Sequence, residues 1–227
     1  MPDKFSTGLL SSTDEDASER SSMVESQLRA RGIRDERVLA AMTKVPRHLF
    51  VPDDEKPRAY RDGPLGIGCD QTISQPYIVA RMCEALNLKP ESRILDVGTG
   101  SGYAAAVEAC LSKHVTGVER IPELAERARH ALAKAGCTNV EVVCTDGSLG
   151  YEANAPFDAI MVAAGAPRVP EELKRQLAVG GRLIIPIGAT QTLQDLILIE
   201  RVSETDYETT NLGSVVFVPL FGKDGWF

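Results

Sequence analysis

The sequence predicts an α/β fold in which a doubly wound, mostly parallel sheet carries helices on both faces. The first observation is a short apolar strand, starting at Ile94, that runs into three glycines at alternate positions and then into a helix-forming segment. The second is a regular alternation of strand-sized apolar runs and helical segments across residues 91–200. The third is a strand-rich carboxyl end, which indicates an antiparallel edge on the sheet.

The composition is that of one soluble globular domain. With 227 residues, 43% hydrophobic and 25% charged, the chain is long enough for a substantial core and is expected to act as a monomer. Its net charge of −7 disfavours a nucleic-acid partner, which requires a basic face. The apolar runs have strand length, so we expect no membrane contact. Five cysteines without a C-x-x-C pair favour a reducing cytoplasm, and three histidines without ligand spacing predict no metal site.

The amino-terminal part divides into a tail and two helices. Residues 1–22 are rich in Ser, Thr, Asp and Glu, and we predict a disordered tail because they bury too little to offset the entropy of ordering. The rest, residues 23–227, is read as one domain with helices and a long loop in 23–90, a core in 91–200 and a strand region in 201–227. A helix over residues 24–31 is expected to end at Gly32. Asp35 is expected to cap the next helix, which Pro46 ends.

The later elements alternate. Pro122 opens a helix that ends at Gly136, and Pro170 opens another, after which Gly180 and Gly181 turn the chain into a strand. Residues 204–211 are polar and are read as a connection. After the strand at Ile94, further strands are expected over residues 114–119, 140–144, 157–163, 182–187, 194–202 and 215–219.

The glycines of Asp96-Val-Gly-Thr-Gly-Ser-Gly102 indicate a cofactor site at the N-terminus of the helix that follows. The third glycine comes one residue too early for a dinucleotide fingerprint, and no P-loop lysine follows. Glu119 lies about 20 residues further on, where a carboxylate accepts hydrogen bonds from ribose hydroxyls. These features favour a cofactor that has adenosine and no pyrophosphate. The run resembles the first motif of the S-adenosylmethionine-dependent methyltransferases, which have a Rossmann-like sheet. The residues that this resemblance places against S-adenosyl-L-methionine are Asp96, Gly98, Gly100, Gly102 and Glu119.

Residues 59–76 form a loop about as long as ordered loops become, and such loops tend to be functional. Pro76 fits the first position of a helix, so Ser74 stands near a helix N-terminus, where free backbone N–H groups favour an anion. Local physics alone favours a simpler role, in which Ser74 or Gln75 caps the helix.

The run Gln71-Thr-Ile-Ser-Gln-Pro76 with Tyr-Ile-Val-Ala80 after it and Asp62-Gly-Pro-Leu before it resembles the signature of the protein-L-isoaspartate O-methyltransferases. The likeness continues through residues 157–162 and 216–220, so it covers nearly everything after Met23. It implies a repair enzyme that methylates the α-carboxylate of L-isoaspartyl residues in damaged proteins and peptides.

The resemblance also implies roles for single residues. Ser74 would orient the substrate carboxylate. Asp146, with Gly147, would accept a hydrogen bond from the adenine amino group, although an aspartate before a glycine is also a common turn. Further substrate-binding residues would be Gln71, Thr72, Ile73 and Val216. The chain departs from the family at Gly66, where proline is frequent, and at Asp70, where glycine is usual and where the added charge would weaken substrate binding.

The acceptor chemistry fits the absence of a general base from the sequence pattern. A carboxylate has a pKa near about 4 and is already deprotonated at neutral pH. An adenine-N6 methyltransferase would need Asn or Asp, then Pro-Pro and an aromatic residue, where Ala163-Ala-Gly-Ala-Pro167 stands; a cytosine-C5 enzyme would need a Pro-Cys pair, which is absent. A small-molecule O-methyltransferase would leave residues 71–76 unexplained. A dehydrogenase or a non-catalytic binding module is disfavoured by the glycine spacing and by Glu119.

Overall fold

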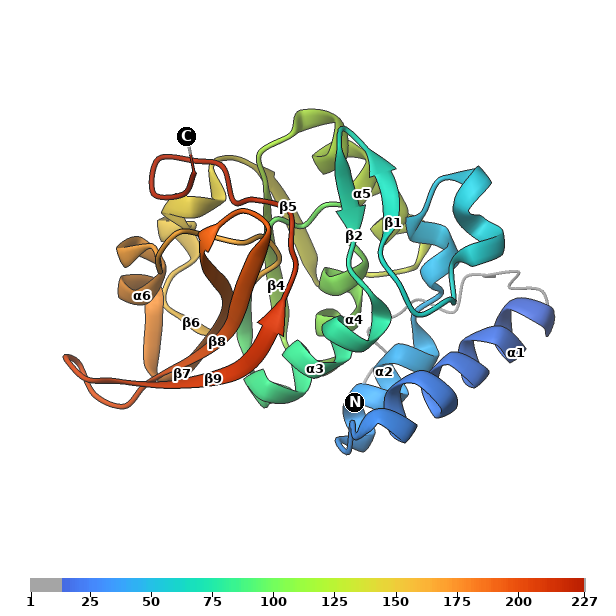
Figure 1. Cartoon of the computed structure of the whole chain (residues 1–227), viewed down its shortest axis with the longest axis horizontal. Coiled ribbons are helices and arrows are strands. Elements are labelled where there is room, and N and C mark those ends of the chain that lie inside the picture. Colours follow the sequence, from blue (N-terminus) through green and yellow to red (C-terminus); the bar gives the residue numbers. More distant parts are fainter. Residues whose placement is uncertain (1–13, 227) are drawn as a thin grey trace.

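The computed structural model describes residues 14–226 and is built on one seven-stranded sheet (Figure 1). The strand order is β5-β4-β3-β6-β7-β8-β9. The strands from β5 to β7 are parallel, and β8 and β9 pair antiparallel at one edge, which confirms the predicted fold class. The strand bounds are β3 Arg93–Val97, β4 His114–Glu119, β5 Val140–Cys144, β6 Phe157–Val162, β7 Leu177–Thr190, β8 Leu193–Arg201 and β9 Tyr207–Val215.

Helices cover both faces of this sheet because the central strands are apolar on both sides. Ile94 of β3 belongs to a core cluster shared with α3 (Pro76–Leu86), α4 (Tyr103–Leu111) and α5 (Pro122–Lys134). Its neighbour Leu95 points to the other face and belongs to a second cluster with Leu173 of α6 (Glu171–Gln176). Two short 3-10 turns, η5 (Gly147–Leu149) and η6 (Glu152–Asn154), lie between β5 and β6.

The amino-terminal helix begins earlier than the sequence predicted. Helix α1 (Asp14–Met23) continues into a π-helical turn η1 (Val24–Leu28) and a 3-10 turn η2 (Arg29–Arg31), and Gly32 ends the run at φ +102°. The prediction of disorder is therefore wrong for residues 14–22, and residues 1–13 lie outside the described part. Long-range bonds hold α1: Arg20 donates to the Thr43 carbonyl at 2.5 Å and to the Tyr60 hydroxyl at 3.3 Å. Composition alone does not reveal such partners.

The next elements lead to the long loop. Asp35 caps α2 (Glu36–Lys44), as predicted, by accepting from the Arg37 N–H at 2.9 Å. The 3-10 turns η3 (Arg47–Phe50) and η4 (Asp53–Arg58) follow. The loop itself contains a β-hairpin, β1 (Leu65–Gly68) and β2 (Gln71–Ile73), that pairs with no other strand. Cys69 and Asp70 form its turn at φ +52° and +57°, the left-handed values that a two-residue hairpin turn requires.

Two boundaries at the carboxyl end differ from prediction. Strand β7 begins at Leu177 and passes through Gly180 and Gly181, where its register with β6 shifts. The last strand, β9 at Tyr207–Val215, begins inside the segment predicted as a polar connection (204–211). It ends at the first residue of the strand predicted over 215–219, so residues 216–219 lie beyond it. Because β9 is an edge strand with mostly exposed residues, it lacks the apolar alternation by which a strand is recognised.

Candidate active site

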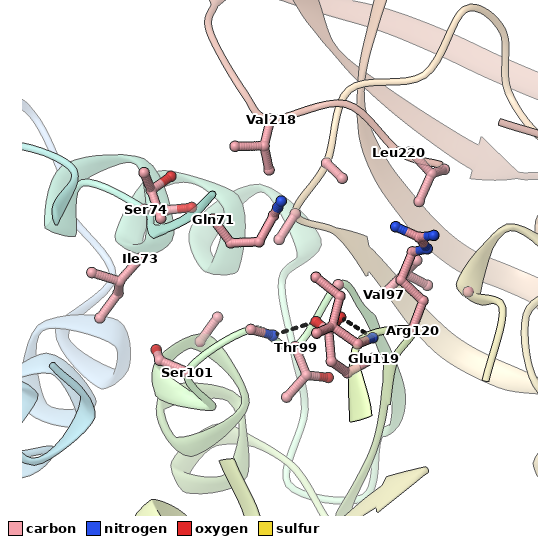
Figure 2. Close-up of a pocket in the computed structure, with 18 of the residues that line it drawn as sticks. Gln71, Ile73, Ser74, Val97, Thr99, Ser101, Glu119, Arg120, Val218 and Leu220 are labelled. Carbon is pink, nitrogen blue, oxygen red and sulfur yellow. Dashed lines mark hydrogen bonds between the residues drawn. The ribbon is translucent and has the colours of Figure 1, made fainter. Parts of the chain in front are cut away.

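A pocket opens at the carboxyl ends of β3, β4 and β6, the side on which doubly wound sheets hold their ligands (Figure 2). Its walls come from β2 and the residues before α3, from the glycine loop, from the end of β4, and from the segment after β9. Predicted site residues that line it are Gln71, Thr72, Ile73, Ser74, Gly98, Gly100, Glu119 and Gly147.

The glycine loop is shaped by close packing. Gly102, at φ +89°, is the N-cap of α4, and a Cβ there would lie 3.2 Å from Leu132 Cγ of α5. A Cβ on Gly147 would lie 2.7 Å from Val97 Cγ1. Glycine is therefore required at these two positions by packing against neighbouring protein atoms, and at Gly102 also by its positive φ.

Glu119 ties this loop to the next helix. Only 5% of the residue is exposed, and its Oε2 accepts from the Gly100 N–H and its Oε1 from the Ile121 N–H, both at 2.9 Å (Figure 2). A carboxylate has about four acceptor sites, so these two bonds leave capacity for the two hydroxyls of a ribose. Apolar residues beside it suit an adenine ring: Val97, Val118, Ile121, Leu220 and Phe221. The donor and acceptor set therefore fits the adenosine cofactor predicted from the sequence.

Asp96 does not line the pocket. Its side chain is fully buried, and both carboxylate oxygens lack a hydrogen-bond partner in the described part of the chain. Glu108 of α4 is equally buried and equally without a partner. Burial raises the pKa of both carboxyls, and the charge of Asp96 raises that of Glu108 further. This geometry does not support direct contact between Asp96 and a cofactor.

Asp146 is also outside the pocket lining. Its Oδ1 accepts from the Ser148 N–H at 2.9 Å and from the Ser148 hydroxyl at 2.7 Å, and its Oδ2 accepts from the Lys223 N–H at 2.9 Å. Asp146 thereby holds residues 218–226, which we call the C-terminal strap. The strap is also held at Trp226, whose indole N–H donates to the Gly165 carbonyl at 3.0 Å.

Ser74 follows β2 and points toward the cavity rather than capping the helix. The N-cap of α3 is Gln75, and it makes no side-chain capping bond. Gln71 reaches from β2 toward Val218 on the opposite wall (Figure 2). The capping alternative is therefore not supported by the geometry.

A second cavity, which we call the groove, adjoins this pocket. It has a volume of about 490 Å³ and lies between α3 and the chain after β9. Val216 lines this groove, not the pocket, and is 73% exposed between buried Val215 and Phe217. Four residues line both cavities, and they are Thr72, Ser74, Ala163 and Val218.

The two departures from the family pattern lie away from the pocket. Asp70 is exposed at the hairpin turn, and Gly66 is exposed in β1 opposite Thr72. Neither lines the pocket or the groove. The structure thus gives Asp70 a turn role, since Asp tolerates positive φ better than most residues.

Sequence reasoning missed Arg120 and Phe221. Both line the pocket, and the Arg120 guanidinium lies 5.6 Å from the centre of the Phe221 ring. The position of Arg120 directly after Glu119 was the available signal. Nothing in the sequence pattern brings Phe221 from the strap to this place.

Two features are absent from residues 14–226. No helix there is both long and apolar enough to cross a bilayer. No group of three or more His, Cys, Asp or Glu side chains is arranged as metal ligands would be.

Comparison with known proteins gives one consistent family. The model of the "Protein-L-isoaspartate(D-aspartate) O-methyltransferase (PCMT)" family matches residues 18–225. Protein-L-isoaspartate O-methyltransferase 2 of Marinobacter nauticus is 58% identical over 207 residues, which are 91% of this chain and 94% of that protein. The Rhodopseudomonas palustris enzyme is 53% identical over 204 residues, or 90% and 94% of the two chains.

Solved structures agree. A protein-L-isoaspartate O-methyltransferase superposes with a TM-score of 0.83 at 29% identity, over 91% of this chain and 67% of the other. A putative protein-L-isoaspartate O-methyltransferase from Plasmodium falciparum, solved in complex with S-adenosyl-L-homocysteine, superposes with a TM-score of 0.77 at 30% identity, over 89% and 98% of the chains.

Proposed function

Because the chain belongs to the protein-L-isoaspartate(D-aspartate) O-methyltransferase family, we propose that the methyl group is transferred where its pocket and its groove join. The family's reaction moves a methyl group from S-adenosylmethionine to the α-carboxylate of an isoaspartyl residue, so the chain is a protein-repair methyltransferase. One observation carries the placement of the transfer: Thr72 and Ser74 line both cavities.

We assign the cofactor to the pocket. The glycine loop and Glu119 would hold the adenosine part, with Gly147 close to the adenine. When bound, S-adenosylmethionine supplies a methyl group on a positively charged sulfur. In this proposal Asp96 and Asp146 do not contact the cofactor. Asp96 acts through its place in β3, and Asp146 acts through its hydrogen bonds to Ser148 and to the strap.

We assign the isoaspartyl segment to the groove. Ser74 would donate its hydroxyl hydrogen to the substrate carboxylate, and the backbone near Thr72 would add neutral donors. Neutral donors suit this step because a tightly paired cation would lower the nucleophilicity of the carboxylate. The two groove arginines already have protein partners: Arg31 pairs with Asp62 at 2.6 Å, and Arg81 donates to the Leu212 carbonyl.

The work of the site is then positioning. A carboxylate acceptor needs no general base at neutral pH. Holding it in line with the methyl group, in a place shielded from water, supplies the acceleration. Val216 would contribute backbone pairing to the substrate segment, since its neighbours Val215 and Phe217 turn inward and leave it exposed.

The test uses labelled S-adenosylmethionine and two peptides that differ only in isoaspartate or aspartate at one position. We expect label in the isoaspartyl peptide alone. Equal labelling of both peptides, or of neither, would overturn the assignment.

We also propose that the protein is a cytoplasmic monomer that binds no nucleic acid. The odd number of cysteines, with no C-x-x-C pair, supports the cytoplasmic location, and the net charge of −7 supports the absence of a nucleic-acid partner. Light scattering during gel filtration measures the mass in solution, and a value near twice the chain mass would contradict the monomer.

A further inference from the structure

The β1–β2 hairpin stands apart from the main sheet, although it carries part of the site. Among the strands of residues 14–226, its two strands pair only with each other. The register sets Thr72 opposite Gly66 and Ile73 opposite Leu65. An isolated two-stranded hairpin is marginally stable in water. Its position over the pocket must therefore be fixed by contacts with the rest of the protein.

Apolar packing fixes one side only. Leu65, Ile67 and Ile73 are buried, and Ile67 Cδ1 lies 3.4 Å from where a Cβ on Gly100 would be. On the side toward α5, a groove of about 390 Å³ lies between Ile67 and the helix. Side chains do not fill this space, so packing alone does not fix the position of the hairpin relative to α5.

Arg127 of α5 crosses that gap. Its Nη1 donates to the Ile67 carbonyl at 2.8 Å, and the same atom lies 3.2 Å from where a Cβ on Gly68 would be. Within residues 14–226, no other hydrogen bond reaches the hairpin backbone from outside the hairpin. Glu123, one turn earlier on α5, lies 3.8 Å from Nη1 in an exposed ion pair, which contributes little by itself.

We propose that Arg127 is a positioning residue, which sets where the hairpin holds Gln71, Thr72 and Ile73 against the pocket and the groove. The inference rests on the proposed role of these residues at the junction. Arg127 itself lines neither the pocket nor the groove assigned to the substrate, so it acts only through the hairpin.

Arg129 provides a matched control on the same helix. Its Nε donates to the Val142 carbonyl of β5 at 3.0 Å, and its Nη1 pairs with Glu126 at 2.9 Å. Arg129→Gln and Arg127→Gln therefore each remove one arginine-to-carbonyl bond made by α5. Only the bond made by Arg127 ends on the hairpin, at the Ile67 carbonyl.

The experiment compares full-length wild type, Arg127→Gln, Arg127→Lys and Arg129→Gln. We expect Arg127→Gln to raise the KM for an isoaspartyl peptide about fivefold, the effect of one hydrogen bond, with a smaller change in kcat. Hydrogen exchange over residues 65–73 should become faster in the same variant. Arg127→Lys keeps a donor and should recover part of both effects, whereas Arg129→Gln should match wild type in both.

Two outcomes separate this inference from the proposed function. If Arg127→Gln and Arg129→Gln show the same KM and the same exchange over residues 65–73, Arg127 does not position the hairpin. If the wild type does not methylate the isoaspartyl peptide at all, the proposed function fails, and the exchange data still decide whether Arg127 holds the hairpin.

Discussion

At the scale of single residues, Ser74 marks the junction of two cavities with different chemistry. The pocket is bounded by a buried carboxylate, Glu119, and by backbone N–H groups, which suits a polar cofactor. The groove is bounded mostly by apolar and neutral polar side chains, and its two arginines, Arg31 and Arg81, already have protein partners, which suits a peptide of varied sequence. Ser74 is a small neutral donor that faces both.

Ser74→Ala should lower kcat for an isoaspartyl peptide by about ten- to a hundredfold, because a donor that orients the reacting carboxylate is lost. Calorimetry with S-adenosylhomocysteine should show a Kd within about twofold of wild type, since the hydroxyl is not required by the adenosine contacts. A variant with unchanged turnover would remove Ser74 from the reaction.

The carboxylates show how far sequence predicts a site. Glu119 was found from its distance to the glycine loop, because that distance is fixed by a strand-helix-strand unit. Asp96 was expected at the cofactor from its place in the strand before the glycines, and Asp146 from the family resemblance, but neither lies in the pocket lining. A motif predicts where an aspartate lies along a strand, but it does not predict which group its carboxylate will contact. Asp146 accepts a hydrogen bond from Lys223 of the strap, which is 77 positions further along the chain.

At the scale of elements, the contact between β3 and α4 contains an unusual pair. Asp96 and Glu108 are both fully buried, and neither carboxyl has a hydrogen-bond partner among the described residues. Burial raises the pKa of the nearby Cys83 thiol of α3, and the charges of Glu108 and Asp96 raise it further. Burial of an ionised carboxylate is costly, so this layer favours the protonated forms.

Glu108→Gln should stabilise the protein more at pH 8 than at pH 5. The pKa of Glu108 is raised in the folded state above its ordinary 4.5, so its contribution to stability is present below that value and is lost as the pH rises. Glutamine does not titrate, so the gain over wild type should grow by at least about 1 kcal/mol between these pH values. Urea denaturation at both pH values measures it, and equal gains at both would contradict the explanation.

Elements were predictable where burial imposes a period. Strands β3 to β6 and helices α2 to α5 appear close to their expected bounds because each has one face, or both, in the core. Helix α1 and strand β9 were not predicted because both are largely exposed. Helix α1 also depends on bonds to distant partners such as the Thr43 carbonyl, which local composition does not report. The hairpin was read as a loop because its strands are only four and three residues long.

At the scale of the whole molecule, the pocket is completed by parts that are far apart in the chain. The hairpin supplies lining residues on one side, the strap supplies others, and the carboxyl ends of the sheet strands supply the rest. Contacts of this kind are set by topology, and no local pattern in the sequence reports them. This is why the family resemblance, which spans both parts, was needed to connect them.

A chain that ends at Phe221 should bind S-adenosylhomocysteine at least about tenfold more weakly. The pocket wall at Val218 to Phe221 would keep the backbone bonds of Val218 and Leu220 to Gly165 but would lose the anchors made by residues 223–226. The bonds removed are those of Lys223 to Asp146, of Asp224 to Ser148 and of Trp226 to Gly165. Calorimetry gives the Kd, and circular dichroism checks that the shortened chain is folded. A folded, shortened chain with wild-type affinity would show that the strap does not support the wall.

The bonds of Glu119 to Gly100 and Ile121 have a thermodynamic consequence. They preorganise the glycine loop from within the protein, so the adenosine half of a cofactor meets a rigid template and loses little affinity to ordering the chain. The entropy cost of forming a complete complex then falls mainly on the hairpin and the substrate segment. Discrimination among substrates is therefore expected to reside in how readily a damaged segment can be ordered, more than in the chemistry of its side chains.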